Sequence, residues 1–235
     1  MPALLLDMDG VLYHGDRVRP GARSFITRIA SVPHLFVTNN SAHTPAMVAN
    51  KLLAMGFEGI CQEQILTSAQ ATAMWLEKEQ PGFRYYAVGG EGLQVALDAR
   101  GKRDAVHADF VVVGEGRGLD YDSLTIGINL VLYQDARLIV TNPDTTVDGW
   151  CNGEHLVQPG GGALVAPFEA ATGHQALVIG KPEPLLFQIV IARLGVNPGD
   201  CVMIGDRPDT DIAGAANAGM QTALVRTGRF LPGDS

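Results

Sequence analysis

Residues 4–16 read LLLDMDGVLYHGD, an apolar run that ends on two aspartates, Asp7 and Asp9, with one residue between them. Side chains of an extended chain alternate between its two faces, so both carboxylates are expected on one side and Met8 on the other. Two negative charges held this close together repel each other. The pattern therefore predicts a positive group between or in front of them.

Composition narrows the class of protein. The chain has 235 residues, of which 46% are hydrophobic, and this is enough for one large domain or two modest ones. With 17 Lys and Arg against 25 Asp and Glu, the formal charge of −8 argues against a nucleic-acid partner. The three cysteines lie far apart, which favours neither a disulfide framework nor a metal clip and fits a reducing cytosol. The stretch PALLL before Asp7 is too short and lacks the basic residues for a signal peptide or membrane span, so we expect a cytoplasmic protein with no membrane partner.

Short apolar runs alternate with helical stretches along the chain, and this alternation predicts an α/β fold with a largely parallel sheet. The expected strands lie in ALLLD, HLFVTNN, RYYAVGG, DFVVVGEG, RLIVTNPD, ALVIGK and CVMIGD.

Capping signals mark the expected helices. Thr44 and Pro45 open one, and Gly56 closes it. Three further segments carry similar signals, namely Thr67 to the Pro81-Gly82 break, Pro184 to Gly195, and Thr210 to Gly219. The stretch after Pro81-Gly82 has strand and helix signals of its own. We therefore predict an inserted domain at residues 82–175 and a core made of residues 1–81 and 176–235.

Polar groups follow four of the expected strands. In a parallel sheet the carboxyl ends of the strands share one edge, where ligands bind, so these groups are expected to meet. Together they provide carboxylates, a hydroxyl, loop amides and one ammonium, which suit a phosphate and a hard cation such as Mg²⁺. The charge expected near the aspartates is then a bound metal, with the lysine close by. The residues are Asp7 and Asp9, Thr38 to Ser41, Lys181, and Asp206.

At this point the chain resembles a known family. DMDGVL, FVTNNS, GKPEP and GDRPDTDI are similar to the four motifs of the haloacid dehalogenase superfamily of phosphatases, in the same order. The long insert, with TNPD and PGGGALVAPFEAATG, resembles the NagD-like branch, which includes p-nitrophenyl phosphatases, pyridoxal phosphatases and phosphoglycolate phosphatases. The resemblance implies a Rossmann-like parallel-sheet core with a smaller inserted α/β cap of the C2 type.

The same resemblance implies a reaction, a cofactor and a partner. The reaction is Mg²⁺-dependent hydrolysis, through an aspartyl-phosphate, of a small phosphorylated metabolite such as a sugar phosphate, a nucleotide monophosphate or phosphoglycolate. Members of this branch often dimerise through the cap, so a homodimer is also expected. Pyridoxal phosphatases carry a histidine shortly after the TNPD-like aspartate, where this chain has Thr145, Thr146 and Val147, and this argues against vitamin B6 phosphate.

Carried over by position, the resemblance assigns a role to each motif residue. Asp7 would be the nucleophile and Asp9 the general acid, consistent with the need for one carboxylate to attack phosphorus and a second to cycle a proton. Lys181 would offset the negative charge on Asp7 and on the transferring group. Phosphate oxygens would be held by Thr38, Asn39 and Asn40. The metal would be held by Asp7, by the main-chain oxygen of Asp9, by Asp206, and by Asp211 directly or through water.

Several alternatives stay open at this stage. His14 and His43 lie next to the first and second motifs and suit a surface or packing role equally well. The glycine-rich turns AVGGEG and VVVGEGRGLD resemble dinucleotide-binding loops but miss the G-x-G-x-x-G spacing, because Leu119 stands where the third glycine would fall. A phosphate-dependent binding or signalling module without turnover would also gather aspartates and a lysine at a sheet edge.

Overall fold

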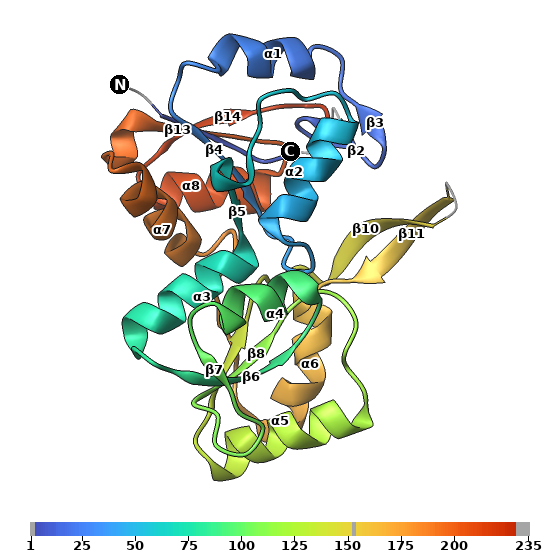
Figure 1. The fold of residues 1–235 in the computed structure, drawn as a ribbon, viewed down its shortest axis with the longest axis vertical. Coiled ribbons are helices and arrows are strands. Elements are labelled where there is room, and N and C mark those ends of the chain that lie inside the picture. Colours follow the sequence, from blue (N-terminus) through green and yellow to red (C-terminus); the bar gives the residue numbers. More distant parts are fainter. Residues whose placement is uncertain (1–2, 152–153, 229–235) are drawn as a thin grey trace. The chain divides into compact units, whose positions relative to one another are not determined.

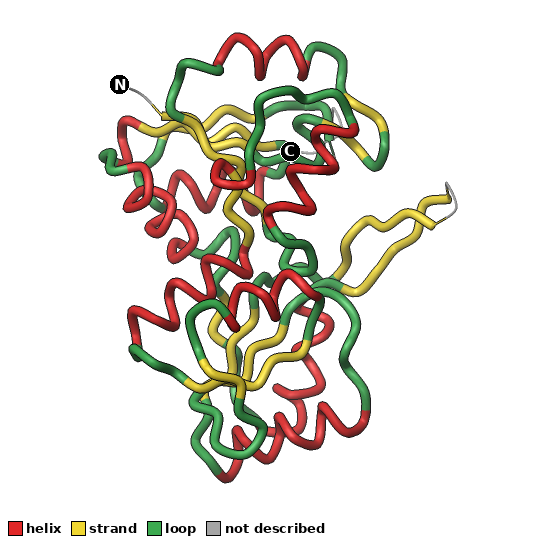
Figure 2. The backbone as a smooth tube through the Cα atoms, in the orientation of Figure 1, coloured by secondary structure: helices red, strands yellow, loops and turns green. Residues whose placement is uncertain are grey.

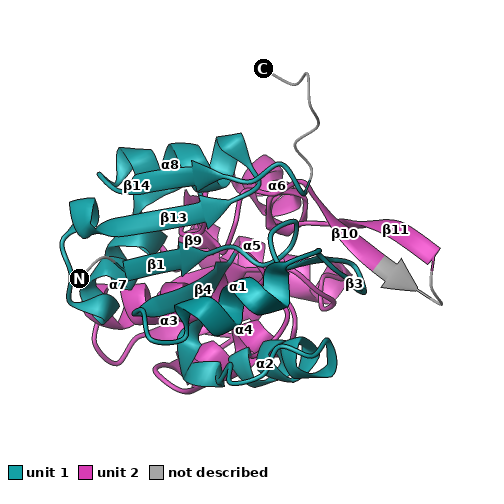
Figure 3. Ribbon diagram, turned by 90° about the horizontal axis from the view of Figure 1, so that it is seen from above, with its two compact units in different colours: residues 1–38, 45–66, 181–235 teal, residues 39–44, 67–180 magenta. Residues whose placement is uncertain are grey.

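The computed structural model describes residues 3–151 and 154–228. The chain forms two compact units, coloured separately in Figure 3. Unit 1 consists of Met1–Thr38, Pro45–Leu66 and Lys181–Ser235, and unit 2 consists of Asn39–Thr44 and Thr67–Gly180. The predicted insertion, residues 82–175, lies within unit 2, which also contains residues 39–44, 67–81 and 176–180.

A five-stranded sheet forms the centre of unit 1, with the strand order β14-β13-β1-β4-β5 (Figure 1). The central strand β1 pairs in parallel with both neighbours, so that Leu5 lies opposite Met203 on one side and Leu35 on the other. The strands are β1 (Ala3–Leu6), β4 (His34–Thr38), β5 (Ile65–Thr67), β13 (Cys201–Gly205) and β14 (Gln221–Leu224).

The buried side chains of unit 1 alternate between the two faces of this sheet. Leu6 and Phe36 pack in a cluster with Ile26 of α1 and Leu52 of α2, whereas Leu5 points away from that cluster. Buried apolar residues of α7 and α8 belong to this unit as well. The helices are α1 (Ala22–Ile29), α2 (Pro45–Ala54), α7 (Pro184–Leu194) and α8 (Ala213–Asn217), with shorter turns η1 (Gln62–Gln64), η2 (Pro198–Asp200) and the π-helical η3 (Pro208–Ile212).

Unit 2 contains a second five-stranded sheet, with the order β12-β9-β8-β6-β7 and parallel pairing throughout. Val111 and Val113 of β8 pack in one cluster with Leu130 of α5 and Phe168 of α6, and the intervening Val112 faces the other side. The strands are β6 (Arg84–Val88), β7 (Lys102–Arg103), β8 (Phe110–Val113), β9 (Arg137–Val140) and β12 (Leu177–Val178). The helices are α3 (Ser68–Glu79), α4 (Glu91–Asp98), α5 (Tyr121–Tyr133) and α6 (Gly161–Thr172).

Each unit also has a two-stranded antiparallel hairpin. In unit 1, β2 (Tyr13–His14) pairs with β3 (Arg17–Val18) directly after the first motif. In unit 2, β10 (Thr146–Cys151) pairs with β11 (Glu154–Pro159), and Figure 2 shows this pair as a long ribbon of strand.

The helix ends follow the predicted capping signals. Pro45 is the first residue of α2, and Gly56 has the positive φ of 78° that suits a residue after a helix. Thr67 accepts a hydrogen bond from Gln70 N at 3.2 Å and so caps α3. Gly195 ends α7 in the left-handed conformation. The α/β class and its parallel sheets are therefore confirmed.

One expected strand lies in a different sheet from the one predicted. The run ALVIG was expected to end, like β1 and β13, at the edge of a common sheet. The structure reduces it to the two-residue strand β12, which pairs with β9 in the sheet of unit 2. An apolar run of this kind fits either sheet, because its pattern carries no information about which strand it will pair with.

Among the helices of residues 3–151 and 154–228, none combines the length and apolar character that a membrane crossing requires.

The cap of α3 yields a prediction about stability. Thr67→Ala removes the side-chain acceptor for Gln70 N, so we expect the free energy of unfolding to fall by about 1 to 2 kcal/mol in urea titrations. The matched control is Thr125→Ala, on the exposed side of α5, which should change it by less than about 0.5 kcal/mol. Equal losses in the two variants would contradict the capping role.

Candidate active site

The carboxyl ends of two adjacent strands bring the first acidic groups of unit 1 together. Asp7 follows β1, and Asp206 follows β13, the parallel neighbour of β1. The ladder continues past the strand end, because Asp7 N donates to Ile204 O at 2.9 Å. Parallel pairing thus places at one edge two residues that are far apart in the sequence, as predicted.

A third carboxylate, Asp211, comes from the π-helical turn η3. Asp211 is fully buried, and its Oδ2 accepts a hydrogen bond from Arg207 N at 3.2 Å. A Cβ at position 205 would lie 2.3 Å from Asp211 Cβ, so only glycine at the end of β13 allows this approach. A widened turn of this kind is often found at functional sites.

Lys181, which was expected to lie close to the paired aspartates and their metal, contacts two carboxylates of the site. Its Nζ donates to Asp7 Oδ1 at 2.7 Å and to Asp211 Oδ1 at 2.6 Å. The lysine side chain is only 4% exposed, so these two carboxylates stabilise a buried charge. Although β12 belongs to the other sheet, Lys181 itself is the residue at which unit 1 resumes.

Burial and charge shift the protonation of this group. The pKa of Asp7 is raised to about 8, mainly by burial; the charge of Lys181 opposes this rise, and the charges of Asp211 and Asp206 add to it. Burial alone would lower the pKa of Lys181, but the carboxylates of Asp211 and Asp7 raise it above its ordinary value. The lysine is therefore charged at neutral pH, and the site holds more acidic groups than one ammonium can balance.

The three carboxylates have the arrangement expected of a site for a hard cation. Among the described residues, Asp7, Asp206 and Asp211 form the group in which one ligand oxygen from each lies within 4.8 Å of the others. An all-oxygen set of this kind suits Mg²⁺. Glycines make room for it, because a Cβ at Gly10 or Gly228 would lie 2.3 or 1.8 Å from Asp206 Oδ2. The residues present therefore fit a divalent cation.

Asp9 differs from Asp7 in its surroundings. Its side chain is 53% exposed, and its Oδ1 lies 3.3 Å from Nδ1 of His14. Met8, between the two aspartates, is buried, which agrees with the predicted alternation. The group of Asp7, Asp206 and Asp211 offers side-chain oxygens only, so the role of the Asp9 main-chain oxygen as a metal ligand stays a prediction. His14, left open by the sequence, is a direct neighbour of the predicted general acid.

The second motif is divided between the two units. Thr38 ends β4 in unit 1, whereas Asn39 and Asn40 belong to unit 2. In unit 2, Asn39 Nδ2 donates to Asp144 Oδ2 at 2.9 Å, and Asn40 Nδ2 donates to Glu115 Oε2 at 3.0 Å. His43, also left open by the sequence, donates from its main-chain N to Asn40 Oδ1 at 3.0 Å.

Two residues in contact with the second motif were not predicted from the sequence. Glu115 lies in a glycine-rich turn that was considered only as a dinucleotide loop, and Asn142 belongs to the TNPD stretch, which served only to identify the branch. Both are buried. For Glu115, the signal available in the sequence was an acidic residue directly after the wholly apolar run FVVVG.

Family models and curated relatives match most of the chain. Residues 4–103 match the family model described as haloacid dehalogenase-like hydrolase, and residues 178–235 match a second model described as HAD-hydrolase-like. The chain is 38% identical over 231 residues to an acid sugar phosphatase of Staphylococcus aureus, covering 96% of this chain and 86% of the relative.

Several solved structures are also similar to this chain over nearly its whole length. NagD from E. coli K-12 matches with a TM-score of 0.90 and 32% identity, over 98% of this chain and 90% of NagD. A 4-nitrophenylphosphatase from Thermotoga maritima matches with a TM-score of 0.90 and 30% identity, over 100% of this chain and 89% of that protein.

The buried ammonium predicts a pH-dependent loss of stability. Lys181→Met leaves Asp7 without its cation, so the pKa of Asp7 in the folded variant should rise further. A carboxyl group whose pKa is raised by folding stabilises the protein at low pH, and this stabilisation is lost as the pH rises. In chelator, we expect the variant to lose about 3 kcal/mol or more in urea unfolding, and clearly more at pH 9.5 than at pH 7, because wild-type Asp7 ionises near pH 8 and the variant's Asp7 only above it. The exposed control Lys78→Met should show little change at either pH, and a loss at position 181 that does not depend on pH would contradict the argument.

Proposed function

Since the chain belongs to the haloacid dehalogenase-like hydrolases and is a NagD-like phosphatase, we propose that it hydrolyses small phosphomonoesters through an aspartyl-phosphate on Asp7. Sugar phosphates are the first substrates to test, because the relative that is 38% identical is an acid sugar phosphatase. Nucleotide monophosphates and phosphoglycolate follow as further candidates. The alternative of a phosphate-dependent binding or signalling module without turnover does not apply, because the chain is a phosphatase.

One observation carries the proposal. Lys181 Nζ lies within hydrogen-bond distance of Asp7, in a site that also holds Asp206 and Asp211. A carboxylate that attacks phosphorus approaches a group that is itself negative, so the nucleophile needs positive charge beside it. Asp7 is the carboxylate of this group that lies at the end of the central strand.

In the first half of the reaction, Asp7 would attack the phosphorus atom through a carboxylate oxygen. The new bond joins that oxygen to phosphorus, and the bond from phosphorus to the ester oxygen breaks. The leaving oxygen takes a proton from the carboxyl group of Asp9, which is more exposed than Asp7. The ammonium of Lys181 offsets the charge that develops beside Asp7.

In the second half, water would attack the phosphorus of the aspartyl-phosphate. Asp9 accepts the proton of that water, so its carboxyl group is restored for the next cycle. The phosphate leaves, and Asp7 recovers its carboxylate. The contact between His14 and Asp9, at 3.3 Å, supports a fixed orientation of the acid through both halves.

Divalent metal binding is proposed for Asp7, Asp206 and Asp211. When bound, Mg²⁺ would supply the positive charge that offsets ionised Asp7 and the phosphoryl oxygens. Asp211 already accepts hydrogen bonds from Lys181 and from Arg207 N, which supports a role in holding the lysine as much as the metal. Thr38, Asn39 and Asn40 are proposed to hold phosphate oxygens.

Unit 2 is proposed to be the cap that selects the leaving group. The residues assigned to proton and phosphoryl transfer, Asp7, Asp9 and Lys181, all belong to unit 1. The stretch Thr145 to Asp148, proposed to influence substrate choice, includes the first residues of β10 in the β10–β11 hairpin, where Asp148 Oδ1 lies 3.0 Å from His155 Nε2. The domain boundaries at 82 and 175, the homodimer through the cap and the cytoplasmic location stay predictions.

The assignment of the nucleophile is tested by Asp7→Asn. The amide is nearly the same size as the carboxylate but cannot accept the phosphoryl group, so kcat for 4-nitrophenyl phosphate should fall by about a thousandfold or more. Asp9→Asn should also be severely impaired and should accumulate a phosphoenzyme, detectable by mass spectrometry, because its amide cannot activate water. More than about a thousandth of the wild-type rate in Asp7→Asn would refute the nucleophile.

The metal is tested without relying on turnover. Mg²⁺ at saturating concentration should raise the midpoint of thermal unfolding by about 3 to 8 °C at pH 8. The rise should be smaller at pH 6, because protons compete with Mg²⁺ for Asp7, whose pKa without a bound metal ion is about 8. Asp206→Asn should remove most of the rise, and an unchanged rise in that variant would contradict the site. In addition, excess chelator should stop hydrolysis.

A further inference from the structure

The segment 39–44 belongs to a different unit from the residues on either side of it. Thr38 and Pro45 lie in unit 1, whereas Asn39–Thr44 is part of unit 2. This segment contains Asn39 and Asn40, two of the three residues proposed to hold the phosphate. The contacts that fix it within unit 2 therefore bear on substrate binding.

Asn142 holds this segment through a side-chain amide whose hydrogen-bonding capacity is fully used. Its Nδ2 donates to Asn39 O at 2.9 Å and to Glu115 Oε1 at 2.8 Å. Its Oδ1 accepts from Asp144 N and from Gly161 N, both at 3.2 Å. A primary amide has two N–H groups and two acceptor positions, so all four are engaged. Aspartate could not replace it, because both donors would be lost and a carboxylate would face Glu115.

Glu115 holds the same segment from a second direction. Its Oε2 accepts from Asn40 Nδ2 at 3.0 Å, and its main-chain N donates to Ser41 Oγ at 2.8 Å. Its main-chain O accepts from Gly90 N at 2.7 Å. The residue is only 4% exposed, and burial raises the pKa of its carboxyl group to about 7. Such a group is costly to bury, which indicates that its hydrogen bonds serve a purpose.

The glycine-rich turn at residues 87–92 has the same function. A Cβ at Gly90 would lie 2.8 Å from Ala42 Cα, and a Cβ at Gly92 would lie 2.4 Å from His43 O. Gly92 N also donates to Ala42 O at 2.8 Å. The sequence suggested a dinucleotide loop as one possible role for these glycines. In the structure they allow the segment 39–44 to lie directly against the rest of unit 2.

We infer that Glu115 and Asn142 are positioning residues for phosphate binding, because they hold the main chain of Asn39 and the side chain of Asn40 in one conformation. The inference rests on the proposed function, in which Asn39 and Asn40 hold phosphate oxygens.

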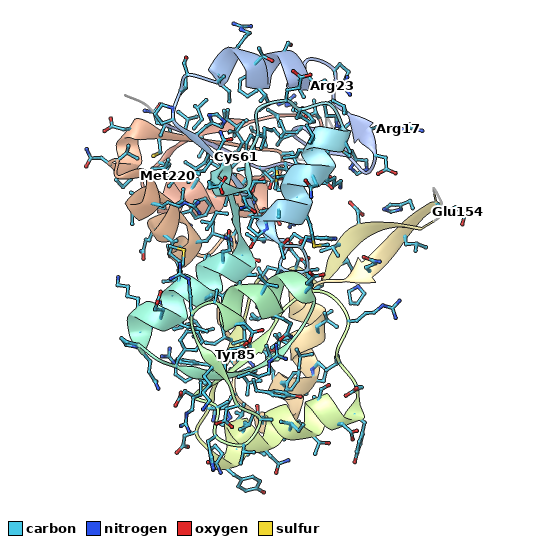
Figure 4. All side chains as sticks on the ribbon, in the orientation of Figure 1. Arg17, Arg23, Cys61, Tyr85, Glu154 and Met220 are labelled. Carbon is cyan, nitrogen blue, oxygen red and sulfur yellow. The ribbon has the colours of Figure 1, made fainter. Side chains whose placement is uncertain are left out.

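The test uses Glu115→Gln and Asn142→Asp in the full-length protein. Glutamine has one acceptor oxygen where two amide donors point, so one of the bonds to Asn40 and Asn142 must be lost. The matched control is Glu154→Gln, an exposed position at the start of β11 that is labelled in Figure 4. Two quantities are measured, namely hydrogen exchange of a peptide covering residues 39–44 without ligand, and the kinetics of 4-nitrophenyl phosphate hydrolysis with inorganic phosphate as inhibitor.

In both variants we expect exchange in the segment 39–44 to accelerate about tenfold or more, with other peptides of unit 2 little changed. The KM for the ester and the Ki for inorganic phosphate should also rise about tenfold, and more than kcat falls. The Glu154→Gln control should match the wild type in both measurements.

Unchanged exchange in the segment in both variants would overturn the inference, whatever the kinetics show. Faster exchange with unchanged KM and Ki would also overturn it, because the segment would then be ordered for something other than phosphate. If Asn142→Asp does not fold, Glu115→Gln alone decides between these outcomes. An active Asp7→Asn variant would refute the proposed nucleophile instead, and the exchange rates would still report on the segment.

Discussion

The arrangement of unit 1 depends on one buried ammonium group placed between two carboxylates. Asp7 and Asp211 could not be buried as charges without Lys181, and the lysine could not be buried without them, so the three groups stabilise one another. Lys181 is also the residue at which the chain resumes unit 1 after unit 2. The same contact therefore fixes the start of the last part of the unit and the charge beside the nucleophile. A change at any of the three residues should affect folding and chemistry together.

Features determined by local sequence could be predicted. The strands β1, β4, β8, β9 and β13, the cap at Thr67, and the placement of Asp7 beside Asp206 followed from apolar runs, capping residues and the shared edge of parallel strands. The sheet to which the ALVIG run belongs could not be predicted, because pairing partners are chosen by contacts distant in sequence. The approach of Lys181 to Asp7, across 174 positions, was expected only because both were assigned to one site.

The residues missed by the sequence analysis share a physical cause. Glu115 and Asn142 carry no periodic signal, since each lies in a loop two residues beyond the end of a strand in unit 2. Their importance comes from partners 75 and 103 positions away, in the segment 39–44. The role of the glycines at 89–92 could not be predicted, because a glycine needed for close packing against another segment looks the same in sequence as one needed for a ligand. The predicted insertion, residues 82–175, likewise does not include this segment, which the structure places in unit 2.

The segment 39–44 also determines how the two units can be exchanged between relatives. The chain crosses between units four times, at residues 38–39, 44–45, 66–67 and 180–181, so unit 2 is not a single contiguous block. A recombination event with its breakpoint between residues 44 and 67 would join the segment of one parent to the Asn142 and Glu115 of another. A crossover that keeps 39–44 with 67–180 retains the hydrogen bond that Asn142 makes across 103 positions, whatever residues the other parent carries. Shuffling of substrate specificity within this family, in nature or in the laboratory, should therefore succeed when this short stretch travels with the larger block.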